Sequence, residues 1–153
     1  MRAAVLAMLT VALVAGCGGG SSRLSRTEFE THLKRDALLA SRATTVASTA
    51  NGETSAVYAQ RIARGQNEMH RAVADLASIL PPKDAESDTK TLIAALRFLD
   101  VQLGKLSQAA AKGNSAAARA VSEAVGKSKE LRAVDAAVKD LQRKGYDVGL
   151  FGH

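Results

Sequence analysis

The chain has 153 residues, enough for one domain, and a formal net charge of +6 at pH 7. Aromatic residues make up only 3% of it and Trp is absent, so a core must be built mainly from small and aliphatic side chains in closely packed helices. The basic residues are dispersed rather than clustered, which argues against nucleic acid as a partner, and the single Cys excludes an internal disulfide.

Residues 1–16 have the pattern of an export signal. The positive start, Met1-Arg2, precedes an apolar stretch, residues 3–14, that contains one Thr. This stretch matches a signal-peptide core in length and is shorter than the roughly 20 residues that span a bilayer. We therefore expect residues 1–16 to be removed and the mature chain to begin at Cys17.

The end of this segment, Val14-Ala15-Gly16-Cys17, has an aliphatic residue, two small residues and a Cys. It resembles the lipobox of bacterial lipoproteins, in which the Cys thiol receives a diacylglycerol and signal peptidase II cleaves before the Cys, here between Gly16 and Cys17. Two acyl chains anchor a protein stably where one is marginal. The resemblance implies that Cys17 holds the protein at the extracytoplasmic face of the cell membrane. An ordinary secretory signal with a coincidental Cys is the alternative.

Residues 17–24 are expected to form the lipidated Cys and a flexible linker, because residues 18–22 are all Gly or Ser. The helical domain is expected at residues 25–145. Ser25 and Glu28 form a capping-box pattern at the start of its first helix. From there, small or apolar residues recur every three or four positions: Phe29, Leu33, Ala37, Ala40, Ala43 and Ala47.

The same periodicity predicts a second helix from about residue 54 to 80. Pro81-Pro82 ends it, because proline cannot continue a helix. A polar loop follows, in which Asp84, Ser87 or Asp88 is expected to cap the next helix.

Two more helices complete the domain. The third is expected to end at Gly113, and Asn114 to cap a fourth that runs without a break from about residue 115 to 143. Strand-like alternation is absent. The sequence therefore predicts an all-α fold, an antiparallel four-helix bundle after a signal peptide and a flexible linker.

Residues 146–153 form a C-terminal tail that is apolar for a chain end. We expect it to fold back over one end of the bundle, and a docking peptide for a partner is the alternative. Its apolar residues are Tyr146, Val148, Leu150 and Phe151.

Residues 24–29, Leu-Ser-Arg-Thr-Glu-Phe, follow soon after the lipobox, and Pro81-Pro82 and Gly113-Asn114 precede the last long helix. In these features the mature chain resembles the small, Ala-rich helical lipoproteins of actinobacteria. The resemblance implies an envelope location and a helical fold, but no activity. Many members of that group carry two further cysteines, and this chain has neither.

The chemistry-bearing residues give no site. His32, His70 and His153 are interpreted as solvent-facing, although Glu28 precedes His32 by four residues and could share its helix face. Bundle metal sites use carboxylates and histidines from facing helices, and no complete pattern appears, so no metal or other cofactor is predicted. Met69 is interpreted as a core residue. Without a nucleophile elbow or a catalytic constellation, the protein is predicted not to be an enzyme.

The sequence favours a membrane-anchored cell-envelope lipoprotein that acts as a non-catalytic interaction or structural module. The alternative is a lipoprotein that binds a small or lipidic ligand between its helices. The expected partners are the membrane, through the N-terminal lipid, and an envelope protein or an anionic lipid or polymer. The basic residues that are candidates for anionic contacts lie on two of the helices: Arg61, Arg64, Arg71, Lys127, Lys129, Arg132, Lys139, Arg143 and Lys144.

Overall fold

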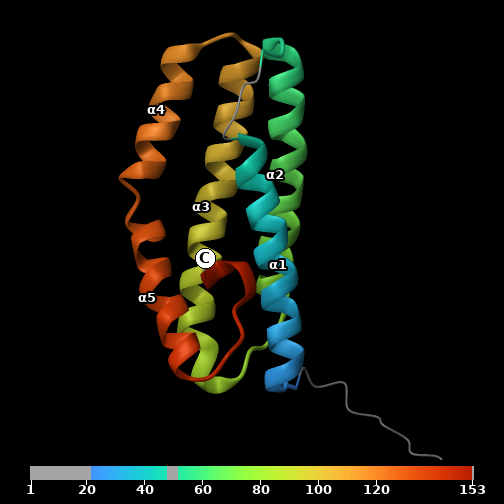
Figure 1. The fold of residues 1–153 in the computed structure, drawn as a ribbon, viewed down its shortest axis with the longest axis vertical. Helices are drawn as coiled ribbons and strands as arrows, with labels where there is room; N and C mark the ends of the chain where they lie inside the picture. Colours follow the sequence, from blue (N-terminus) through green and yellow to red (C-terminus); the bar gives the residue numbers. More distant parts are fainter. Residues whose placement is uncertain (1–21, 48–51, 153) are drawn as a thin grey trace, which may run out of the picture.

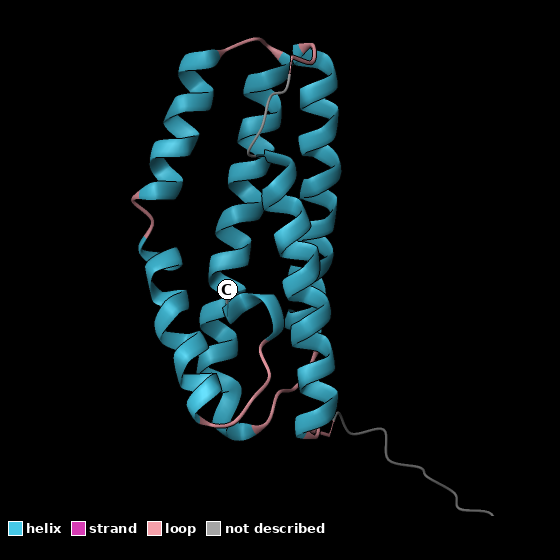
Figure 2. Cartoon of the chain, in the orientation of Figure 1, coloured by secondary structure: helices cyan, strands magenta, loops and turns pink. Residues whose placement is uncertain are grey.

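The computed structural model describes residues 22–47 and 52–152, and every regular element in these ranges is a helix. The long helices run up and down in antiparallel order, joined by short loops (Figures 1 and 2). The predicted all-α bundle is confirmed. In chain order the elements are α1 (Arg26–Ala47), α2 (Ser55–Ser78), the 3-10 turn η1 (Lys83–Ala85), α3 (Glu86–Ala111), α4 (Ser115–Gly126), α5 (Lys129–Arg143) and the 3-10 turn η2 (Gly149–Gly152).

Side chains at the helix starts explain most of these bounds. The predicted capping box is present: the Ser25 N–H donates to Glu28 Oε2 over 2.8 Å, and the Glu28 N–H donates back to Ser25 Oγ over 3.4 Å. Thr54 and Asn114 cap α2 and α4 by accepting from backbone N–H groups three residues on. Such caps satisfy N–H groups that have no partner within the helix.

The start of α3 differs from the prediction. Ala85 is the N-cap residue and no side chain caps the helix. The expected caps have other partners, because Asp84 Oδ1 accepts from the Tyr146 hydroxyl over 2.8 Å and Asp88 Oδ2 accepts from Lys144 Nζ over 2.7 Å. The turn η1 leads the chain into α3 instead, so the prediction of a capped start was wrong.

The last predicted helix is broken into α4 and α5. Ser128 has extended backbone dihedrals, φ −63° and ψ 129°, and its Oγ accepts from the Leu131 N–H over 3.2 Å. Its hydroxyl also donates to Glu130 over 2.8 Å. Ser residues compete in this way with helical backbone hydrogen bonds and favour helix starts. The prediction of one continuous helix over residues 115–143 was therefore wrong at Ser128.

The core is concentrated where α2 packs against α1 and α3, the two most extensive helix interfaces. Small side chains allow α1 and α2 to approach closely at Gly65, where an added Cβ would lie 3.0 Å from the Ala43 carbonyl oxygen. Met69 is fully buried, as the sequence predicted. The largest apolar side chains with almost no exposure are Phe29, Leu33, Ile62, Met69, Leu76, Leu92 and Leu141.

The C-terminal tail folds back onto the bundle, but its last residues pack along the side, against α1 and α5, and not over the end as expected (Figure 1). Tyr146 and Val148 are buried, and the Tyr146 ring meets the Phe29 ring edge-to-face with 5.5 Å between centroids. The Arg26 guanidinium also lies over the Tyr146 ring, 4.7 Å from its centroid. The tail thus ties α1 to the end of α5.

Across residues 22–47 and 52–152, no helix combines the length and hydropathy needed to cross a bilayer.

Candidate functional site

The lipobox residues Val14, Ala15, Gly16 and Cys17 lie outside the described residues, so lipidation at Cys17 stays a prediction. The described residues begin close behind them and attach to the bundle at once. The Leu24 N–H donates to the Leu80 carbonyl over 2.8 Å, and Arg23 donates to the Pro81 carbonyl over 2.8 Å. An anchor on Cys17 would therefore be separated from the folded domain by only a few residues.

An apolar groove runs beside α1. α4 and α5 pack on α3, but neither forms an extensive interface with α1 within the described ranges. In Figure 1 α4 and α5 stand on one side of α3 while α1 and α2 stand on the other. We call the resulting depression the side groove, and it consists of two cavities that share Thr44 and Leu99.

Both cavities of the side groove are lined mainly by aliphatic side chains. The cavity beside α4 has a volume of about 250 Å³. The cavity beside α5 has a volume of about 310 Å³ and is bounded by the tail residues Leu150 and Phe151. Residues from three helices line the first cavity: Thr44 and Ala47 of α1, Leu99, Leu103 and Leu106 of α3, and Val121 and Val125 of α4.

The polar groups in the side groove do not converge on a reaction centre. The Thr44 hydroxyl donates within its own helix, to the Ala40 and Ser41 carbonyls over 3.1 and 3.0 Å. Ser122 likewise donates to the Ala118 carbonyl over 3.3 Å. These two hydroxyls are used locally, and the remaining lining is mainly aliphatic, so the groove offers chiefly apolar surface.

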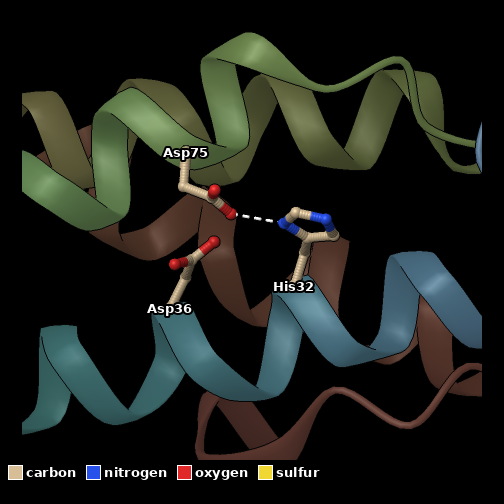
Figure 3. Close-up of side chains that lie close together, drawn as sticks. All are labelled: His32, Asp36 and Asp75. Atoms are coloured by element: carbon tan, nitrogen blue, oxygen red, sulfur yellow. Dashed lines mark hydrogen bonds and ion pairs between the residues drawn. The ribbon is translucent and has the colours of Figure 1, made fainter.

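A second cluster lies between α1 and α2, where Figure 3 shows His32, Asp36 and Asp75 turned toward one another. His32 Nδ1 lies 2.5 Å from Asp75 Oδ2. The Arg35 guanidinium contacts the same carboxylate oxygen and lies 3.1 Å from His32 Nδ1. His32 is thus about a quarter exposed and paired, so the prediction that it faces solvent was wrong.

The two carboxyl groups of this cluster are driven apart in pKa. Burial, reinforced by the nearby Asp75, raises the pKa of Asp36 to about 7. Partial burial alone would also raise the pKa of Asp75, but its interactions with His32, Asp36 and Arg35 outweigh burial and lower it. At neutral pH, Asp75 is therefore the charged member, and Asp36 lies near its titration midpoint.

The remaining predicted candidates do not form sites. His70 faces solvent as expected, with its side chain 73% exposed, and lies 3.5 Å from Asp100 Oδ2. The Glu28 carboxylate accepts a hydrogen bond from the Ser25 hydroxyl, and His153 lies outside the described residues.

Several basic residues have acidic partners within the chain. Arg61 pairs with Glu53, and Arg143 and Lys144 both pair with Asp140. The expected positive face is therefore partly neutralised.

No family model, no curated protein and no solved structure matches this chain.

Proposed function

We propose that this protein is a lipoprotein of the cell envelope, anchored through a diacylglyceryl group on Cys17, whose helical domain is a non-catalytic interaction module. The lipobox pattern supports the anchor. Six peptide units separate Cys17 from Arg23, where the chain meets the domain, and an extended chain spans at most about 3.6 Å per residue. The domain is thus held within roughly 20 Å of the membrane surface.

The observation that carries the interaction role is the side groove. Because the last helices do not close against α1, buried and half-buried aliphatic side chains of α1, α3 and α4 line an open cavity. Hydrophobic grooves between helices accept the apolar side chains of a partner helix. The Thr44 and Ser122 hydroxyls in the groove are bonded within their own helices, which supports a binding role rather than catalysis.

A second candidate is the binding of an acyl chain in the same groove. Two observations favour it: the cavities adjoin through Thr44 and Leu99, and the Thr44 and Ser122 hydroxyls are occupied within their own helices. A mainly aliphatic lining suits a hydrocarbon chain better than a polar metabolite. The short tether would place this groove near a source of such chains.

The proposal is tested by photo-crosslinking in living cells from Ser122, which lies at the exposed rim of the groove. The matched control is the next residue, Glu123, which is also exposed but does not line the groove. Each variant is made in the wild-type chain and with Cys17→Ala. Adducts are identified by mass spectrometry, and the membrane and soluble fractions are compared.

A protein adduct at position 122, weak at 123 and lost with Cys17→Ala, supports the interaction module. A lipid adduct with the same pattern supports the second candidate. Equal labelling at both positions, or none at 122, contradicts a role for the groove. If the Cys17→Ala protein stays as firmly membrane-bound as the wild type, the anchor is wrong.

A further inference from the structure

His32, Asp36 and Asp75 form a ligand set that the proposed binding role does not use. One ligand atom from each residue lies within 4.8 Å of the other two. His32 and Asp36 are one helical turn apart on α1, and Asp75 faces them from α2 (Figure 3). Bundle metal sites are built from such side chains on facing helices.

Asp36 itself points to a ligand. Its side chain is 0% exposed, yet its Oδ2 has no hydrogen-bond partner within residues 22–47 and 52–152. Its carboxyl group is directed toward Asp75 and His32 rather than into the apolar core (Figure 3). An unsatisfied buried carboxylate oxygen is costly, and a bound cation removes that cost.

We propose that His32, Asp36 and Asp75 bind a divalent transition-metal ion, with Zn²⁺ as the representative ion. One imidazole nitrogen and two carboxylate oxygens make a donor set that suits Zn²⁺ and its first-row neighbours. His32 and Asp75 are each about a quarter exposed, so an ion can enter and water can complete its coordination. The site is separate from the side groove, so it stands or falls independently of the proposed interaction role.

Arg35 allows the sign of one mutational effect on metal binding to be predicted. Its guanidinium occupies the space around Asp75 Oδ2 and His32 Nδ1, the atoms that an ion would use. Its side chain is 51% exposed and therefore has room to swing into solvent. Arg35 is thus a competing cation, and its removal should strengthen metal binding. A purely structural ion pair predicts no such gain.

The experiment measures Zn²⁺ binding to the purified full chain in detergent by calorimetry, and Co²⁺ binding by visible absorption. Four chains are compared: wild type, His32→Ala, Arg35→Ala and His70→Ala. His70 is the matched control, because it is the histidine of the other described His–Asp pair and sits on the exposed surface. Circular dichroism checks that each variant folds.

We expect one Zn²⁺ per chain, loss of more than about tenfold in affinity with His32→Ala, no change with His70→Ala, and tighter binding with Arg35→Ala. If His32→Ala fails to fold, the gain in affinity with Arg35→Ala and the Co²⁺ spectrum of the wild type still decide whether the site binds a metal ion. The proposal is overturned if the wild type binds no Zn²⁺ up to millimolar concentration. It is also overturned if His70→Ala removes the binding, or if Arg35→Ala leaves it unchanged or weaker.

Discussion

The two halves of the bundle are held together in different ways. α1, α2 and α3 share a core of fully buried large side chains, and α1 and α2 approach closely through Gly65. α4 buries only Val121, and its alanines are exposed or half-buried. α5 adds Leu141 to the core near its C-terminal end, and Lys144, just beyond that end, pairs with α3. The comparison shows that an Ala-rich helix needs a close partner to be held by packing, because each Ala buries little area.

The largest difference should appear when a core side chain is truncated. Leu76→Ala removes a fully buried side chain from α2 and should lower the free energy of unfolding by about 2–5 kcal/mol. Val121→Ala, in the lightly packed α4, should lower it by less than about 1.5 kcal/mol. Urea unfolding followed by circular dichroism measures both. Equal losses would mean that α4 belongs to the same cooperative core.

The second effect concerns the buried carboxyl group between α1 and α2. A folded-state pKa raised to about 7 means that the folded protein keeps the Asp36 proton at pH values where the unfolded chain has lost it. Stability from this group is therefore present at low pH and lost as pH rises through the folded pKa, by about 2 kcal/mol between pH 5 and 7.

Asp36→Asn is close in size to the native side chain but cannot ionise, so this loss with rising pH should disappear. Asp135→Asn on the exposed surface of α5 is the matched control and should retain the wild-type profile. Unfolding free energies at pH 5, 6, 7 and 8 test the difference. A wild-type slope that persists in Asp36→Asn would assign the pH dependence to another group.

The third effect tests how closely the helices approach. Gly65→Ala places a methyl group against the Ala43 backbone and the Val46 side chain, and should destabilise the protein by about 1–3 kcal/mol. Gly126→Ala, at the end of α4, meets no atom within 4 Å and should raise stability by up to about 1 kcal/mol. A lower melting temperature for Gly65→Ala and a higher one for Gly126→Ala would confirm that contact between helices, and not the loss of glycine itself, causes the different effects.

The smallest effect is expected at the break between α4 and α5. Ser128→Ala removes the side chain that caps α5 and should cost about 0.5–2 kcal/mol. Ser128→Asp keeps a capping oxygen and should retain most of the stability. Amide hydrogen exchange at the start of α5 reports the change locally. An unchanged exchange rate in Ser128→Ala would show that packing, and not the cap, fixes the break.

Periodicity was sufficient to predict the fold class, because three- and four-residue spacing marks helix faces regardless of tertiary contacts. It missed the break at Ser128, since Ser128 continues the stripe from Val125 to Leu131 and a small residue fits such a stripe. The Ser128-x-Glu130 pattern was the available signal. The side groove depends on how far α4 stands from α1, and the sequence pattern within one helix does not determine that distance.

The cluster around Asp36 was missed for a related reason. Asp36 follows Leu33 by three residues, so it falls beside the apolar face of the first helix, and a carboxylate there was the available clue. Its partner Asp75 comes from another helix 39 positions later, and only the packing of α1 on α2 brings the two together. Local spacing within one helix cannot predict such a pair.

The attachment of Arg23 and Leu24 to the α2–α3 loop has a mechanical consequence. A pull on a membrane tether at Cys17 would reach the Leu24–Leu80 hydrogen bond and the Arg23–Pro81 and Arg23–Glu86 contacts before it reached α1. These bonds spread the load onto the chain between two other helices. Force would therefore meet the bundle at several points together instead of peeling the first helix away turn by turn.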